Sequence, residues 1–282
     1  MSIPSIRLSN DENMPAMIVG TFQHNRYQTL KDIVSICIEN GFTGFDTAPS
    51  YGNEESLGKA IHESMHEQSL KRENIYLIDK IDAWQMQKTS GKVTQFVDDA
   101  LLKLKTEYLD LLLIHWPIPN YFENTWDTLI DLYSRGKTKA IGICNVNERH
   151  LIHITKQSGF IPHVVQIERH PLRTDQNTVN FNRENNILTQ SYSPLFRMME
   201  PLRSSKIINK IAQKYNKNIG QIIMRWHIDT DSVPVFMTSK EYRIKEYADI
   251  FNFRLEAAEI ESISSLNCNH KIFLESVGCP GY

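Results

Sequence analysis

The feature that most constrains this chain is a repeated alternation of short apolar runs with stretches of helical periodicity. The run Thr43–Asp46, for example, is followed after a polar stretch by Leu57, Ile61 and Met65, which recur at the spacing of one helix face. Alternation of this kind is typical of βαβ units, in which a helix connects two parallel strands. The sequence therefore predicts an α/β fold built on a parallel sheet.

The alternation continues along most of the chain and predicts eight strands. They are Ile18–Thr21, Thr43–Asp46, Ile75–Ile78, Leu109–Ile114, Ala140–Ile143, Val164–Ile167, Ile187–Gln190 and Val233–Phe236. Eight such units close naturally into a (β/α)8 TIM barrel, a fold of about 250 residues that forms one domain. We therefore expect a single domain over residues 1–282. Periodicity alone leaves open the alternative of an open, doubly wound sheet.

Three further segments lie outside the eight units. Ser5–Met17, with Asn10 and Asp11 at its centre, is expected to form a β-hairpin that closes the N-terminal end of the barrel. Ile219–Ile228 and Leu255–Leu266 have helical periodicity and are expected to form two extra helices. The predicted fold is thus one barrel with an N-terminal hairpin and two additional helices.

Charge and composition restrict the class of partner. The formal net charge is −2 and no long basic run occurs, which argues against a nucleic-acid binder. The N-terminus has no apolar core of signal-peptide length, and no run of about 18 apolar residues is present. We therefore expect a soluble, cytoplasmic protein that acts on a small molecule and has no membrane partner. A monomer is expected, although nothing in the sequence determines the oligomeric state.

The four cysteines show neither metal-binding nor disulfide spacing. Cys37, Cys144, Cys268 and Cys279 form no C-x-x-C pair and no regular framework. Reduced thiols are the expected state, and no metal site is predicted.

Polar or ionisable side chains lie at or near the ends of six of the expected strands. They are Asp46, Lys80, His115, Asn145, Gln166 and Tyr192. In a parallel barrel the carboxyl ends of all strands meet at one mouth, where active sites are built. A single strand-end Asp, Lys or His is more commonly a salt-bridge partner or loop anchor than a catalyst. Six such groups at one mouth make that mouth the expected functional site.

Four motifs then narrow the function. Residues Gly41–Gly58 read GFTGFDTAPSYGNEESLG, and LLIHWP, QIERHP and YSPL follow at Leu112–Pro117, Gln166–Pro171 and Tyr192–Leu195. In sequence and in order these motifs resemble those of the aldo-keto reductase family, over roughly residues 15–266. The resemblance implies a barrel that transfers hydride from NAD(P)H to the carbonyl group of an aldehyde or ketone.

The resemblance implies that Asp46, Tyr51, Lys80 and His115 are the catalytic residues. Tyr51 would deliver the proton to the carbonyl oxygen, although a phenol with a pKa of about 10 is a weak acid unless its surroundings tune it. We expect the Lys80 cation to lower the pKa of Tyr51, and Asp46 to hold Lys80 in place. His115 would donate to the substrate oxygen and orient it.

The resemblance also implies a cofactor site. Its expected residues are Gly20, Thr21, Asn145, Gln166, Tyr192, Ser193, Leu195, Thr238, Arg243 and Glu246. Asn145 and Gln166 would bind the nicotinamide carboxamide and Tyr192 would stack on its ring, unless the two amides only satisfy backbone groups at the strand ends. Cys144 stands where the family usually has serine, which weakens one hydrogen bond because a thiol is a poor donor.

Two departures from the family bear on cofactor choice. The triplet Phe236-Met237-Thr238 lacks the lysine that usually meets the 2′-phosphate of NADPH, and Phe196 and Arg197 stand where small residues are usual. Arg243 remains to bind the phosphate. We expect NADPH to be preferred by a reduced margin and NADH to be usable.

Aromatic residues near the mouth are candidates for the substrate pocket. Phe22, Trp84 and Trp116 are the expected substrate-binding residues, and Trp116 is favoured because it adjoins His115. The alternative for the other two is loop packing. The identity of the carbonyl substrate does not follow from the sequence.

Two other functions remain open at this stage. A strand-end lysine in a barrel can act as the nucleophile of a Schiff-base aldolase, which would give Lys80 a different role. A protein of the same fold could also bind the cofactor as a sensor, without turnover. No G-x-G-x-x-G motif follows a strand, which argues against a Rossmann dinucleotide site.

Overall fold

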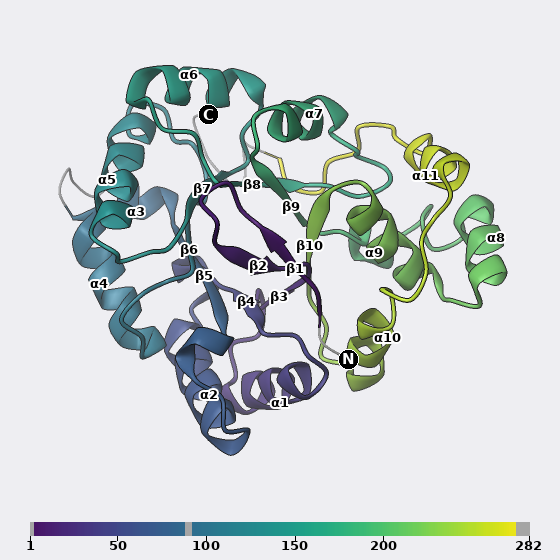
Figure 1. The fold of residues 1–282 in the computed structure, drawn as a ribbon, viewed down its shortest axis with the longest axis horizontal. Coiled ribbons are helices and arrows are strands. Elements are labelled where there is room, and N and C mark those ends of the chain that lie inside the picture. Colours follow the sequence, from purple (N-terminus) through teal and green to yellow (C-terminus); the bar gives the residue numbers. More distant parts are fainter. Residues whose placement is uncertain (1–2, 88–91, 275–282) are drawn as a thin grey trace.

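The barrel closes as predicted. The computed structural model describes residues 3–87 and 92–274. Eight parallel strands form a closed barrel (Figure 1): β3 (Ile18–Gly20), β4 (Gly44–Asp46), β5 (Tyr76–Ile81), β6 (Leu111–Ile114), β7 (Ile141–Cys144), β8 (Val164–Glu168), β9 (Leu188–Tyr192) and β10 (Ser232–Phe236). β10 pairs with both β9 and β3, so the sheet has no free edge. Closure confirms the (β/α)8 prediction and excludes an open, doubly wound sheet.

Eight helices surround the barrel, one after each strand in chain order: α1 (Tyr27–Glu39), α2 (Glu54–Glu67), α4 (Val93–Leu104), α5 (Phe122–Ser134), α6 (Glu148–Ser158), α7 (Gln176–Glu184), α9 (Ile219–Asp229) and α10 (Glu241–Ala248). Most of them turn an apolar stripe inward, as α1 does with Leu30, Ile33 and Val34. α1 ends at Glu39 with Asn40 as its C-cap, and Gly41 follows with a φ of 85°. Glycine suits this left-handed position because it has no Cβ.

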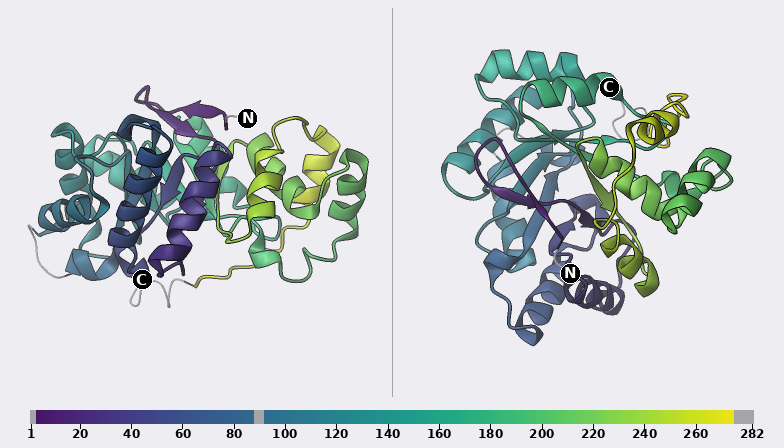
Figure 2. Two further views of the ribbon diagram at one scale, coloured as in Figure 1. Left: turned by 90° about the horizontal axis from the view of Figure 1, so that it is seen from below. Right: turned by 45° about the vertical axis from the view of Figure 1, so that its right-hand side comes forward.

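Three further helices bring the described part of the chain to eleven: α3 (Ala83–Gln87), α8 (Lys206–Tyr215) and α11 (Ala257–Ser264). The two helices expected near residues 219–228 and 255–266 are present as α9 and α11. α9 packs against β10, whereas α8 contacts α9 and α11 and lies farther from the barrel (Figures 1 and 2). In this region α8 is therefore the helix added outside the eight. α9 belongs to the eight, because it is buried over Gly220–His227.

The N-terminal hairpin covers the amino-terminal end of the barrel. β1 (Ser5–Arg7) pairs antiparallel with β2 (Asn13–Pro15), and Figure 2 shows the hairpin lying across one end of the strands. The side chain of Met14 is fully buried in the cluster that fills the barrel interior. Asn10 donates from Nδ2 to the carbonyl of Lys139 at 2.8 Å. The hairpin therefore closes this end as expected and leaves the opposite end of the barrel for a ligand.

Three observations concern membrane-spanning helices, disulfide bonds and metal sites, none of which the sequence predicts. Of the helices in the described ranges, none has the length and apolar character needed to cross a membrane. Cys37, Cys144 and Cys268 are free thiols, and Cys279 lies outside the described residues. Residues 3–87 and 92–274 contain no cluster of three or more metal-ligating side chains.

Candidate active site

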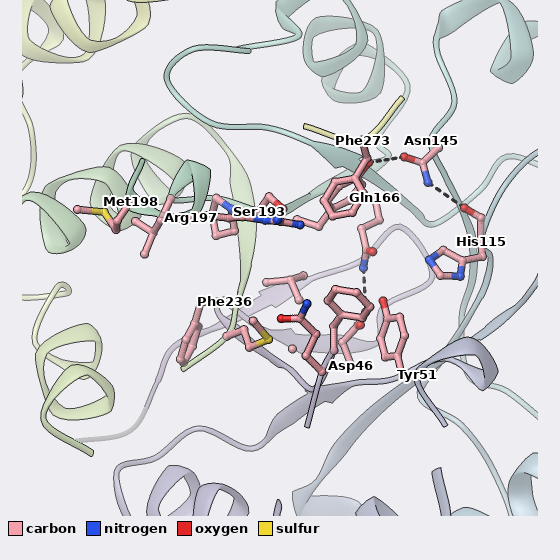
Figure 3. A pocket seen from close by; sticks show the side chains of 18 of the residues that line it. Asp46, Tyr51, His115, Asn145, Gln166, Ser193, Arg197, Met198, Phe236 and Phe273 are labelled. Atoms are coloured by element: carbon pink, nitrogen blue, oxygen red, sulfur yellow. Dashed lines mark hydrogen bonds between the residues drawn. The ribbon is translucent and has the colours of Figure 1, made fainter. Parts of the chain in front are cut away.

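A cavity of about 850 Å³ opens at the carboxyl ends of the strands. Figure 3 shows side chains from several strands and loops pointing into it. The sequence-predicted residues that line it are Gly20, Phe22, Asp46, Tyr51, His115, Trp116, Asn145, Gln166, Tyr192, Ser193, Leu195 and Arg243. Residues 150 positions or more apart in the chain thus meet at one mouth, as the barrel topology requires.

Lys80 lies beneath the cavity floor and connects two of these residues. Its side chain is fully buried on β5, and its Nζ lies 2.5 Å from Asp46 Oδ1 and 2.9 Å from the carbonyl oxygen of Thr47. The Tyr51 hydroxyl lies 3.3 Å from the same Nζ. The three protons of the ammonium group therefore have three oxygen acceptors, one of which is the phenol that faces the cavity.

The pKa of Tyr51 differs from the expectation. Burial raises it above the ordinary value, and this effect outweighs the opposite effect of the neighbouring Lys80 cation. Lys80 does act in the predicted direction, but the net shift is upward because the phenol lies in a desolvated floor. The hydroxyl therefore keeps its proton at neutral pH, which is the form that a proton donor needs.

The same geometry bears on the aldolase alternative. Burial by itself would lower the pKa of Lys80, but the adjacent Asp46 carboxylate more than compensates, so the pKa lies above the ordinary value. A Schiff base requires a neutral amine as nucleophile. A protonated Lys80 with three oxygen partners does not supply one, so the site favours acid catalysis over amine catalysis.

His115 forms a hydrogen bond with Asp82, a carboxylate that the sequence did not indicate as a site residue. His115 Nδ1 lies 2.5 Å from Asp82 Oδ1, and the ring centroids of His115 and Tyr51 are 6.0 Å apart. Asp82 directly follows β5 and stands two residues after Lys80, so the alternation of side chains along a strand could have indicated it. The imidazole ring of His115 thus separates the Asp82 carboxylate from the cavity.

Two amide side chains lie above the floor. Asn145 donates from Nδ2 to the carbonyl oxygen of His115 at 2.9 Å and accepts from the Tyr192 hydroxyl at 2.7 Å (Figure 3). Gln166 Nε2 donates to Asp46 Oδ2 at 3.0 Å and to Gln190 Oε1 at 2.9 Å. Both side chains therefore have fixed orientations before any ligand binds.

Cys144 takes part only weakly in this network. Its thiol is buried and lies 3.8 Å from Gln166 Oε1. Burial raises the pKa of Cys144 above the ordinary value, so the group stays a neutral thiol and a weak donor.

Three arginines bring positive charge to the cavity. Arg197, Arg203 and Arg243 line it, all three are exposed, and none forms an ion pair within the described part of the chain. Arg197 lies in the turn Phe196–Met198, where all three residues have positive φ. Such a run is costly for non-glycine residues and turns the loop sharply at the rim of the cavity. Guanidinium groups without ion pairs, together with amides and an aromatic ring in one cavity, fit a dinucleotide.

Five of the predicted site residues do not line the cavity. Besides Lys80 beneath the floor, they are Thr21, Trp84, Thr238 and Glu246. Thr21 is buried and donates to the Asp46 carbonyl, whereas Thr238 accepts from the backbone N–H of Lys240. Trp84 requires a correction: it packs edge-on against Phe96 and lines a different hollow beside α4, because the chain turns into α3 directly after β5.

The aromatic residues at the mouth come from three separate segments. Phe22 lies edge-on to the Tyr51 ring with centroids 5.1 Å apart, and Trp116 is largely buried beside His115. Phe273 also lines the cavity and lies 5.8 Å from the Tyr192 ring. Its backbone N–H and that of Ile272 donate to the Glu168 carboxylate. No local pattern indicated Phe273, since only the folded position of the C-terminal segment brings it to the mouth.

Comparison with known proteins decides the family. The family model for the Aldo/keto reductase family matches residues 16–268. The chain belongs to the aldo-keto reductase family. The uncharacterized oxidoreductase YtbE of Bacillus subtilis is 33% identical over 94% of this chain and 93% of its own length. The methylglyoxal reductase DkgA of Yersinia pestis is 32% identical over 95% of both chains, and the glyoxal reductase of Bacillus subtilis is 32% identical over 95% of this chain and 94% of its own.

Solved aldo-keto reductases have the same architecture. An enzyme from Brucella melitensis superposes with a TM-score of 0.85 at 34% identity, over 94% of this chain and 100% of its own. An aldo-keto reductase from Bombyx mori, solved in complex with NADP, gives a TM-score of 0.92 at 27% identity, over 98% of this chain and 97% of its own. The predicted family, the barrel and the class of NAD(P)H-dependent carbonyl oxidoreductase are thereby confirmed for this aldo-keto reductase.

Proposed function

We propose that this aldo-keto reductase uses NADPH to reduce small aldehydes and ketones, with Tyr51 as the proton donor. The observation that carries the proposal is the buried chain of contacts from Asp46 through Lys80 to the Tyr51 hydroxyl, which faces the cavity. The pKa of Tyr51 is raised by burial, so the donor carries its proton throughout the neutral range.

Each residue of the floor has one task in this mechanism. A nicotinamide cofactor held in the cavity would supply the hydride for the carbonyl carbon. Tyr51 gives its proton to the carbonyl oxygen, and Lys80 stabilises the phenolate that remains. Asp46 keeps Lys80 in place, and His115 binds the carbonyl oxygen from the side of the Tyr51 ring. The buried floor excludes water, which strengthens each of these electrostatic effects.

The cofactor residues follow from the lining of the cavity. Asn145 and Gln166 would bind the carboxamide, and Tyr192 would stack on the nicotinamide ring. The rest of the cofactor would contact Gly20, Ser193 and Leu195. Arg243 would bind the 2′-phosphate, with Thr238 and Glu246 beside the adenosine and Thr21 supporting Asp46 from behind. NADPH is then preferred by a reduced margin and NADH is usable, because Met237 has no charge to add.

The relatives indicate which substrates to test first. Proteins that are 32% identical over nearly the whole chain are named for the reduction of glyoxal and methylglyoxal. Both are small molecules with two adjacent carbonyl groups, and a floor with two donors, Tyr51 and His115, suits such a substrate. We therefore place 2-oxoaldehydes first, ahead of sugar-derived carbonyls.

A carbonyl panel tests the proposal. Loss of NADPH absorbance with purified protein should be fastest with 2-oxoaldehydes and should give alcohol in equal amount. Tight NADPH binding without reduction of any panel member would show a cofactor-sensing protein instead. Trapping of a substrate on Lys80 by borohydride would show a Schiff-base aldolase.

The assembly, compartment and domain organisation complete the proposal. We propose that the active unit is a monomer. We propose that it acts as a single domain over residues 1–282 in the cytoplasm. Light scattering of the purified protein and fractionation of cells test the assembly and the compartment, and limited proteolysis tests for a second domain.

A further inference from the structure

Asp82 holds two parts of the candidate active site at once. It is buried at the carboxyl end of β5, and its Oδ1 lies 2.5 Å from His115 Nδ1. Its Oδ2 accepts the backbone N–H of Ser50 at 2.6 Å, next to Tyr51 in the chain. The Asp82 backbone is itself anchored, since its carbonyl accepts from Gln85 and Met86 at the start of α3. The carboxylate is therefore a fixed acceptor between His115 and the segment that carries Tyr51.

The protonation state of Asp82 follows from its partners. Burial alone would raise the pKa of Asp82, but the hydrogen bonds from His115 and Ser50 outweigh burial and lower it. An ionised carboxylate can only accept hydrogen bonds. The proton between Asp82 and His115 therefore belongs to Nδ1.

The other ring nitrogen then decides what His115 can do. Within residues 3–87 and 92–274, no hydrogen bond reaches Nε2, and the ring lines the cavity beside Tyr51 (Figure 3). A neutral imidazole with its proton on Nδ1 has a lone pair on Nε2 and cannot donate there. His115 can donate to a carbonyl oxygen only when a second proton makes it an imidazolium.

We infer that Asp82 is a positioning residue that fixes the Nδ1–H form of His115 and so makes its hydrogen bond to the substrate oxygen depend on protonation of the ring. The inference rests on the proposed carbonyl reduction. It predicts an activity that decreases as pH rises, because the donor is lost while Tyr51 keeps its proton.

Of the other groups around the pair, Asp79 alone could contribute to such a decrease, and the variant Asp82→Asn leaves Asp79 in place. The titratable groups near Asp82 and His115 are Tyr51, Asp79 and Cys144, and Lys80 and Asp46 follow behind Tyr51. Tyr51, Lys80 and Cys144 all have pKa values raised above their ordinary values, so they keep their protons in the neutral and mildly alkaline range. Burial raises the pKa of Asp79 well above its ordinary value, and Asp46 is paired with Lys80.

The variant Asp82→Asn tests the inference sharply because it is isosteric. The Ser50 N–H still requires an oxygen at the position of Oδ2, which turns the new NH2 group toward Nδ1 of His115. Nδ1 then has to accept, and neutral His115 carries its proton on Nε2, where it can donate at any pH. We expect kcat/KM at saturating NADPH to fall by about tenfold or more from pH 6 to pH 9 in the wild type. In Asp82→Asn it should change by no more than about threefold.

A second measurement does not depend on activity. Nitrogen-15 NMR of the wild type at alkaline pH should show His115 protonated on Nδ1, and Asp82→Asn should show it protonated on Nε2. Ser50→Ala is the matched control, since it removes the 3.2 Å hydroxyl contact to Asp82 but leaves the contact to His115. It should keep the wild-type tautomer and pH profile.

The outcomes separate the two proposals. An Nε2–H tautomer in the wild type, or an unchanged pH profile in Asp82→Asn, overturns the role of Asp82. A rate that drops equally at all pH values in Asp82→Asn shows a merely structural anchor and also overturns it. An Nδ1–H tautomer in a protein that reduces no carbonyl supports the role of Asp82 in the ring geometry and removes the proposed function instead.

Discussion

At the scale of single residues, the site depends on where protons are held. Lys80 is buried with three oxygen partners, and burial raises the pKa of Tyr51 despite the adjacent cation. The arrangement keeps a proton on the phenol and a positive charge directly below it. In the proposed mechanism, stabilisation by Lys80 therefore matters most after the proton has left, when Tyr51 becomes a phenolate.

Tyr51→Phe removes the proposed proton donor and leaves the ring and its contact with Phe22 in place. We expect kcat to fall by about a hundredfold or more, while the Kd of NADPH changes little. Stopped-flow turnover and fluorescence titration of the cofactor give the two values. Near-normal turnover in this variant would remove Tyr51 from the mechanism.

Met237 and Arg243 test how the chain selects its cofactor. Both line the cavity, and Met237 is 44% exposed. Met237→Lys should tighten the binding of NADPH by about tenfold, equivalent to ~1.4 kcal/mol, and leave the binding of NADH nearly unchanged. Arg243→Ala should weaken NADPH selectively. Titrations with both cofactors decide the matter, and equal effects on NADH and NADPH would show that neither side chain contacts the 2′-phosphate.

At the scale of elements, close helix packing supports the loop that carries Tyr51. Helix α2 begins just after that loop and lies against α4 at Gly58. A Cβ on Gly58 would lie 2.4 Å from the carbonyl oxygen of Lys103 and 2.6 Å from the Cα of Leu104. Because both contacts are with backbone, neither helix can adapt by moving a side chain.

Gly58→Ala should therefore lower the free energy of unfolding by about 1–3 kcal/mol, as other overpacked positions do. Gly220→Ala on α9 is the control, since its closest contact would be the Asn218 side chain at 3.2 Å. There the gain in helix propensity of about 0.5–1 kcal/mol should offset the crowding. Urea unfolding followed by circular dichroism compares the two, and equal midpoints would show that α2 and α4 are not in close contact at Gly58.

At the scale of the whole molecule, charge is distributed unevenly. The chain has a formal net charge of −2, yet three arginines without ion pairs in the described residues line one cavity. A concave site with charge of one sign raises the local concentration of an anionic ligand. The mouth is thus suited to a phosphorylated cofactor although the molecule as a whole is slightly acidic.

Salt should therefore weaken the binding of NADPH more than the binding of NADH. Between about 0.05 and 0.5 M salt we expect the KM for NADPH to rise by about threefold or more, with a smaller rise for NADH. Arg203→Ala should reduce this salt dependence. Arg135→Ala, which removes an exposed arginine paired with Asp131 on α5, should leave it unchanged. Identical salt dependence in both variants would show that net charge, and not the cavity, attracts the cofactor.

Local pattern determined more of the fold than of the site. Alternating apolar runs predicted all eight strands, and the motifs around Asp46, Tyr51, His115 and Gln166 predicted the family, because strand and helix periodicities and strand-end positions are local properties. The strand β5 runs to Ile81, so that Lys80 lies within it, and this boundary was not predicted, since polar Asp79 and Lys80 interrupt the apolar run.

Only the tertiary structure decided the remaining features. The pairing of Asp82 with His115, the position of Phe273 at the mouth and the departure of Trp84 from it all join or separate segments that are distant in the chain. The net direction of the Tyr51 pKa shift was also undetermined by sequence, because burial and the Lys80 charge act in opposite directions and only the packed floor sets their balance. The sequence by itself thus determined which elements form and which reactive groups they carry. Closure of the barrel decided which of those groups meet and how much water remains around them.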